Sequence, residues 1–195
     1  VTVAGVDLFA PQYGDFSSKN PQPVKQAFAD RALAALRQLP GVESSALTSA
    51  TPLKGETWVD YLHRPDRPLP DGQEPLVNVR FIDPDYLPTM RIPVVAGRNI
   101  SAGDRGDPYV ALISERTARE AFPGEDPIGR KIGSLAPDSD HLFTVVGVVA
   151  DTRINGLKDT AAMAYAPYWV FTHWTLSFLV RSSQPSDVLI PEIDR

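Results

Sequence analysis

Apolar side chains recur at three- and four-residue spacing between residues 21 and 39, the spacing of one face of an α-helix. The positions are Val24, Phe28, Ala32, Ala35, Leu36 and Leu39. Pro40 and Gly41 follow at once, and this pair is a strong helix stop. Alternating patterns predict strands over residues 1–9 and 42–48. The chain therefore begins with a predicted strand–helix–strand unit.

The rest of the chain reads as short elements. Apolar runs predict strands over 76–82, 109–113, 130–134, 143–150, 163–168 and 175–181, with 130–134 and 143–150 forming a hairpin. Asp83 and Ser114 are placed to cap short helices over 84–90 and 114–122, and a further helix begins at about 187 behind Ser186. The first strand–helix–strand unit has no partner before 175–181. This order predicts an α+β fold in which a split βαβ unit holds a mainly β insertion.

Composition and charge exclude several classes of protein. The 195 residues include 19 Lys and Arg against 24 Asp and Glu, and the resulting net charge of −5 argues against a nucleic-acid binder. The chain has no cysteine, which excludes disulfides, thiolate zinc sites and cysteine nucleophiles. The longest apolar run, 143–150, is much shorter than the roughly 20 residues of a membrane-spanning helix.

Three groups of residues are candidates for a chemical site, and none has the required pattern. The loop 124–131 has Arg130 and Lys131 where a phosphate-binding loop needs Lys followed by Ser or Thr. The run 138–141 (Asp-Ser-Asp-His) is expected at a hairpin tip, where Asp and Ser commonly form turns. The three histidines, His63, His141 and His173, lie far apart along the chain. The sequence therefore predicts no catalytic residue, no cofactor and no metal.

Aromatic residues are dense near the end of the chain. Tyr168, Trp169, Phe171 and Trp174 lie in or beside the connection between two predicted strands. They are candidates for a partner surface, because exposed aromatic groups often dominate interfaces. Trp169, Phe171 and Trp174 are expected to be the most exposed of the four. Core packing is the alternative, since strands favour aromatic residues.

An ordered series of segments resembles the MacB-like periplasmic core domain of bacterial ABC transporter permeases. The segments are LPGVESSALTSATPL (39–53), DPDYLPTM (83–90), Ile92-Pro93, Gly97-Arg98, VALISE (110–115), FPGEDPIGRKI (122–132), VVGVVAD (145–151), YAPY (165–168) and 176–181. Their shared order covers about the whole chain. Three features depart from the family pattern. Arg91 stands where glycine is usual, Pro88 where a helix former is expected, and the connection 169–174 is aromatic where a polar link is more common.

The resemblance implies a fold and a place in the cell. It implies a porter-like βαβ lobe from residues 1–55 and 166–195, with a mixed, mainly β lobe inserted over 56–165. It implies a non-catalytic domain on the periplasmic side of the bacterial cytoplasmic membrane, joined to the permease's own transmembrane helices. A cytoplasmic subunit or domain would bind ATP. The remaining expectations are coupling of hydrolysis to conformational change, contact with a periplasmic partner protein or exported substrate, and a homodimer in the full transporter.

Alternatives and one further expectation accompany this interpretation. A ligand-binding sensor domain of a membrane protein is the main alternative, and an apolar pocket between the lobes would favour it. An enzyme such as a hydrolase is a weaker one, since no acid, base and nucleophile occur in spaced motifs. By symmetry with the first strand–helix–strand unit, the rest of the last helix and one more strand are expected beyond Arg195.

Overall fold

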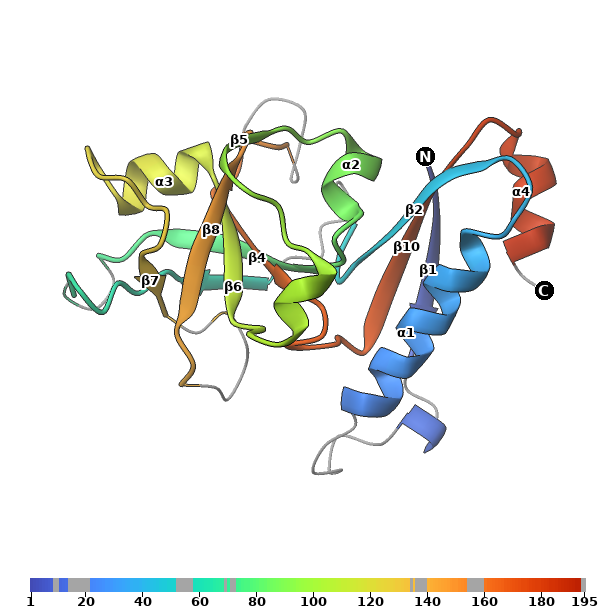
Figure 1. Cartoon of the computed structure of the whole chain (residues 1–195), viewed down its shortest axis with the longest axis horizontal. Coiled ribbons are helices and arrows are strands. Elements are labelled where there is room, and N and C mark those ends of the chain that lie inside the picture. Colours follow the sequence, from blue (N-terminus) through green and yellow to red (C-terminus); the bar gives the residue numbers. More distant parts are fainter. Residues whose placement is uncertain are drawn as a thin grey trace.

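The computed structural model describes residues 1–8, 11–13, 22–51, 58–68, 70, 73–133, 135, 140–153 and 160–193. The first part of the structure is built from strands β1 (Thr2–Asp7), β2 (Val42–Thr48) and β10 (Thr175–Ser182) and helix α1 (Gln22–Leu36). β10 lies between β1 and β2 and is antiparallel to both. α1 thus connects two parallel strands that a third strand separates. It packs on one face of them, where Phe28 meets Phe178 with ring centroids 6.3 Å apart (Figure 1).

The second part continues the same sheet with strands of mixed direction. It contains β3 (Trp58–Tyr61), β4 (Leu76–Ile82), β5 (Val94–Gly97), β6 (Val110–Ser114), β7 (Lys131–Ile132), β8 (Phe143–Val149) and β9 (Met163–Pro167). β4 pairs with β9, and β6 with β8, in parallel, whereas the other pairs are antiparallel. All five residues of β6 and of β9 are buried, as expected for strands covered on both faces.

Short helices complete the fold. They are η1 (Pro11–Tyr13), α2 (Tyr86–Met90), η2 (Ala102–Arg105), α3 (Glu115–Ala121) and α4 (Ser186–Ile193). The Ser114 side chain accepts a hydrogen bond from Thr117 N–H, which confirms its predicted capping role. The β7–β8 hairpin and the helix behind Ser186 are also confirmed. Phe9, Pro21, Ser134 and Asp194, at the ends of predicted elements, lie outside the described residues.

The two parts of the sheet meet at one narrow place, here called the sheet junction. The strand order is β1-β10-β2-β4-β9-β6-β8-β5, and the only residue pair between β2 and β4 in the described ladder is Thr48 with Ile82. Two backbone hydrogen bonds flank this pair, from Ser49 N–H to the Phe81 carbonyl at 2.9 Å and from Asp83 N–H to the Leu47 carbonyl at 3.2 Å. Two side chains extend the pairing by bonding to backbone. Asp83 Oδ1 accepts from Leu47 N–H at 2.8 Å, and Ser49 Oγ accepts from Phe81 N–H at 3.1 Å. Asp83 therefore does not cap α2 as predicted, because its side chain is used by β2 and Asp85 takes the N-cap position.

The mixed helix-and-sheet architecture is confirmed. The finer division into a lobe of residues 1–55 and 166–195 and an inserted lobe of 56–165 stays a prediction. The predicted apolar stripe of α1 is only partly right. Phe28 and Ala32 are half-buried and Leu36 is buried, but Val24 is 48% exposed. The fully buried stripe is instead formed by Lys25, Ala29, Leu33 and Leu36.

Arg91 ends α2 in a backbone conformation that favours glycine. Its φ of 57° and ψ of 43° are left-handed. Its N–H donates to the Pro88 carbonyl at 3.1 Å and Ile92 N–H donates to the Leu87 carbonyl at 2.9 Å, the two bonds of a Schellman motif. A residue with a Cβ pays a conformational penalty here that glycine avoids.

Replacing Arg91 with glycine should therefore stabilise the protein, by about 1 kcal/mol. Urea unfolding monitored by circular dichroism measures the change. Arg91→Ala is the matched control, because it removes the same side chain and keeps the Cβ. An equal gain in both variants would mean that the arginine side chain, and not the backbone, is responsible.

Candidate functional site

The connection between β9 and β10 is held against α1 by three hydrogen bonds, here called the α1 clasp. Lys25 Nζ donates to the Thr172 carbonyl at 2.6 Å, and Gln26 Nε2 donates to the Trp169 carbonyl at 2.6 Å. Thr172 N–H donates to Gln22 Oε1 at 2.7 Å. β9 belongs to the second part of the sheet and β10 to the first, so the β9–β10 connection is a crossing between the two parts. The clasp fixes α1 to this crossing.

The four aromatic residues predicted as a partner surface lie within and beside this clasp. Tyr168 is 1% exposed and Trp169 is 8% exposed, so the expectation that Trp169 is exposed is wrong. α1 covers this segment through the clasp, and the Arg105 guanidinium lies 4.7 Å from the Trp169 ring centroid. Phe171 and Trp174 are half-buried. A role for these aromatics in binding a partner stays a prediction.

Lys25 is the buried centre of the clasp. It is fully buried, and its ammonium lies 4.2 Å from the Trp174 ring centroid and 5.7 Å from that of Phe171, the geometry of cation–π contacts. None of the described carboxylates forms an ion pair with it. Burial therefore lowers the pKa of Lys25 to about 8. The sequence gives no signal for this residue, since a lysine beside an apolar stripe normally faces water.

The lowered pKa of Lys25 predicts an unusual alkaline response. Above pH 8 the unfolded chain holds this proton and the folded protein does not, so stability should rise with pH. Between pH 8 and 9.5 the Lys25 contribution to the free energy of unfolding should rise by about 1.5 kcal/mol. It is measured as the difference in pH dependence between the wild type and Lys25→Met. Lys131→Met, at an exposed lysine, should leave the pH dependence unchanged; an identical profile for Lys25→Met would contradict the prediction.

A polar crevice of about 270 Å³ separates α1 from the second part. Asp30 of α1 pairs with Arg105 of η2 at 2.7 Å and accepts a short hydrogen bond from the Tyr168 hydroxyl. Past the end of α1, Arg37 pairs with Asp85 at 2.5 Å and reaches Asp83 at 3.4 Å. Burial, followed by the bond to Asp30 and its charge, raises the pKa of Tyr168. These contacts, here called the crevice pairs, join α1 to the second part beside the sheet junction.

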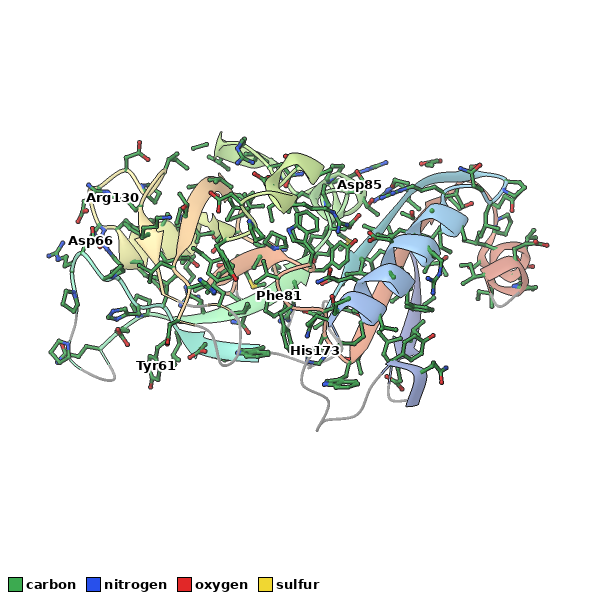
Figure 2. All side chains as sticks on the ribbon, turned by 60° about the horizontal axis from the view of Figure 1, so that its bottom comes forward. Tyr61, Asp66, Phe81, Asp85, Arg130 and His173 are labelled. Atoms are coloured by element: carbon green, nitrogen blue, oxygen red, sulfur yellow. The ribbon has the colours of Figure 1, made fainter. Side chains whose placement is uncertain are left out.

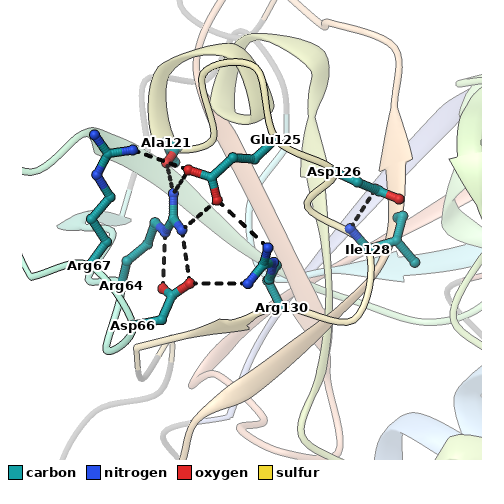
Figure 3. Close-up of polar contacts among 8 residues, drawn as sticks. All are labelled: Arg64, Asp66, Arg67, Ala121, Glu125, Asp126, Ile128 and Arg130. Atoms are coloured by element: carbon teal, nitrogen blue, oxygen red, sulfur yellow. Dashed lines mark hydrogen bonds and ion pairs between the residues drawn. The ribbon is translucent and has the colours of Figure 1, made fainter.

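A second polar cluster lies at the far end of the molecule from α1 (Figures 2 and 3). The Arg64 side chain, 6% exposed, reaches Asp66 at 2.9 Å and Glu125 at 3.0 Å. It also donates to the Ala121 carbonyl at 2.8 Å, and its guanidinium lies 4.3 Å from the Phe122 ring centroid. Arg64 thus joins the segment after β3 to the end of α3 and the loop that follows.

The other sequence candidates do not form a chemical site among the described residues. The loop 124–131 is a turn in which Gly124 and Gly129 have φ of 74° and 80°. Its Glu125 carboxylate is occupied by arginines. No three His, Asp or Glu side chains of the described chain are grouped to hold a metal ion. Asp138 and Ser139 lie outside the described residues.

The overall fold is shared with extracytoplasmic domains of solved transporter structures. The periplasmic region of MacB from Actinobacillus actinomycetemcomitans is 16% identical with a TM-score of 0.60, covering 84% of this chain and 70% of that one. The extracellular domain of the noncanonic ABC-type transporter YknZ from Gram-positive bacteria is 14% identical with a TM-score of 0.55, covering 83% and 76%. A permease domain from Porphyromonas gingivalis is 21% identical with a TM-score of 0.54, covering 80% and 69%.

The fold is thus that of an extracytoplasmic permease domain. The family model of the MacB-like periplasmic core domain matches residues 3–190, and the chain belongs to this family. No curated protein sequence matches it. The resemblance read from the sequence is confirmed. The chain is a periplasmic domain of a MacB-like ABC-type transporter permease, a type of protein that has membrane helices and an ATP-binding partner.

Such domains are generally non-catalytic. None of the helices in the described part of this chain is long and apolar enough to cross a membrane.

Proposed function

We propose that this domain couples ATP hydrolysis in the cytoplasm to movement outside the membrane by bending at the sheet junction. The observation that carries the proposal is the single residue pair, Thr48 with Ile82, between the two parts of the described sheet. A sheet that is joined so narrowly bends there at a lower cost than across a full ladder. The charged crevice pairs Arg105–Asp30 and Arg37–Asp85 join side chains that are 42–49% exposed, so water can replace these contacts and they can break and re-form as α1 moves. The proposal includes the division of the chain into two lobes that move relative to each other, one of residues 1–55 and 166–195 and one of residues 56–165.

A cross-link across the crevice tests the coupling. Arg37→Cys with Asp85→Cys places two thiols on opposite sides, in a chain without native cysteines. Joining them with a short thiol-reactive cross-linker in the complete transporter should abolish transport, while the unlinked double variant retains it. The matched control links Arg116→Cys to Glu120→Cys, which lie within α3 and form a pair of similar length, 2.7 Å. Normal transport by the protein cross-linked between positions 37 and 85 would overturn the proposal.

The same proposal includes handling of a periplasmic partner or exported substrate and a homodimeric transporter. Phe171 and Trp174 are the half-buried members of the aromatic group, so they are the ones that a partner could reach. Phe171→Ser and Trp174→Ser should each weaken transport more than they lower stability. A purely structural role predicts that transport falls only in proportion to the loss of folded protein.

A small-molecule sensor is the second candidate function. It is favoured by a hollow of about 500 Å³ at the sheet junction, on the side lined by Ser49, Trp58, Val79 and His173. Trp58 is the natural reporter, because a ligand in this hollow would contact its ring. A saturable change in tryptophan fluorescence that Trp58→Phe removes would favour sensing over mechanical coupling.

A further inference from the structure

Asp83 is a buried carboxylate at the sheet junction itself. Its side chain is 1% exposed. One oxygen accepts from Leu47 N–H on β2 at 2.8 Å, and the other lies 3.4 Å from the Arg37 guanidinium. Arg37 is 44% exposed and makes its shorter contact, 2.5 Å, with Asp85. The backbone N–H of Asp85, in the same segment, also stabilises the carboxylate. Asp83 therefore has one hydrogen bond from β2, one local backbone contact and one weak ionic contact to offset the loss of water.

The charged and titratable groups around Asp83 do not make up this deficit. The crevice beside it is lined by Asp30, Arg37, Asp85, Arg105 and Tyr168. Arg105 is paired with Asp30, and Arg37 is shared with Asp85. From β2 only a backbone N–H reaches the carboxylate. Burial first, and then the charge of Asp85, raise the pKa of Asp83 to about 7, against the opposing effects of Leu47 N–H, the Arg37 charge and Asp85 N–H.

Movement of α1 would change this environment. The crevice already reaches Asp83 on the α1 side, so displacing Arg37 and the end of α1 would bring water to the carboxylate. A solvated aspartate has an ordinary pKa of about 4. The closed junction therefore binds a proton that the open junction releases, and linkage requires that pH shifts the balance between them.

We propose that the sheet junction is proton-linked through Asp83, so that the closed arrangement is favoured with the carboxyl protonated and its ionisation favours opening. This inference rests on the proposed bending at the junction and adds its regulation. The ratio of open to closed molecules should rise with pH, by up to about tenfold per pH unit between pH 5 and 7. The substitution Asp83→Asn keeps an acceptor for Leu47 N–H and removes the titrating group, so this variant should be folded and insensitive to pH.

Distances between two spin labels measure the opening. Ala34 on α1 and Val95 on β5 are exposed and belong to the two parts that the crevice separates, so each is changed to cysteine and labelled. At pH 5 one distance population is expected, and a second should grow between pH 5 and 8. Asp83→Asn should keep one ratio at every pH. Glu43→Gln, which removes an exposed carboxylate on β2 that does not line the crevice, should keep the pH response.

The outcomes separate this inference from the proposed function. Distances that are independent of pH in the wild type, or a pH response that persists in Asp83→Asn, would overturn proton linkage at Asp83. If the Arg37–Asp85 cross-link nevertheless blocks transport, bending at the junction stands without it. If the cross-linked transporter is active and the labels report one distance at all pH values, both are wrong.

Discussion

Replacing Trp169 with alanine should lower the free energy of unfolding by about 4 kcal/mol, the usual cost of removing a buried tryptophan. The ring is 8% exposed, packs edge-on against Tyr168 at a centroid distance of 5.4 Å and carries the Arg105 guanidinium. Its removal leaves a cavity under α1 that the clasp and the crevice pairs hinder from closing. Chemical denaturation followed by circular dichroism measures the loss.

Two further variants make this prediction specific. The Trp169 Nε1 is buried and has no acceptor among the described residues. Trp169→Phe removes that unsatisfied group and keeps most of the apolar contact, so it should cost no more than about 1 kcal/mol. Trp174→Ala, at a half-buried ring, should cost less than Trp169→Ala. If Trp169→Ala lowers the free energy of unfolding by less than about 1 kcal/mol, the ring is exposed, as the sequence predicts, and not buried.

Arg64→Ala should destabilise the protein by about 2 kcal/mol, mainly because the buried Ala121 carbonyl loses its donor and the packing of Arg64 on Phe122 is lost. Asp66 and Glu125 would lose their charge-assisted hydrogen bonds, and the Ala121 carbonyl would lose its donor (Figure 3). The two carboxylates are 38% and 28% exposed, so water limits the cost. Thermal unfolding at neutral pH measures the change.

Arg67→Ala is the matched control for Arg64. Arg67 also pairs with Glu125, at 3.1 Å, but is 61% exposed, so its removal should cost about 0.5 kcal/mol or less. Hydrogen bonds from Arg64 lower the pKa of Asp66 and of Glu125. Their stabilisation is therefore present at neutral pH and lost as both carboxyls become protonated in acid. The difference in free energy of unfolding between the wild type and Arg64→Ala should therefore become smaller in acid. Equal losses of stability in Arg64→Ala and Arg67→Ala would mean that burial of the arginine is unimportant at this cluster.

The two kinds of contact suit two different parts of the domain. The Arg64 side chain is buried and contacts two carboxylates and the Ala121 carbonyl, so it holds the segment after β3 against the end of α3. The charged crevice pairs Arg105–Asp30 and Arg37–Asp85 join side chains that are 42–49% exposed, so they hold α1 in place and can still exchange with water. A domain that transmits movement needs both properties, because force is carried by rigid parts and converted to motion only where the contacts are weak.

Local patterns in the sequence are sufficient for most elements. The strands predicted over 42–48 and 76–82 have the bounds of β2 and β4, because alternation has a period that only a strand satisfies. Ser114 marks the start of α3, because its cap bond to Thr117 is made within one turn. The ordered segments are also sufficient for the family, which the match over residues 3–190 confirms.

The site depended on contacts that no local pattern encodes. Lys25 is buried because Thr172, 147 residues away, supplies an acceptor for its ammonium. The Asp83 carboxylate accepts a hydrogen bond from Leu47 N–H on β2, a contact across the sheet junction that no local pattern predicts. Periodicity identifies which residues share a face of a helix, but neighbouring faces differ by one residue, and only the packed sheet decided that Lys25 and not Val24 is covered. The sequence by itself determined the elements, their order and the family. Tertiary packing decided which polar side chains are buried, Lys25 in the clasp and Asp83 at the sheet junction among them. The sequence could not show this, because the desolvation of a residue depends on everything packed around it.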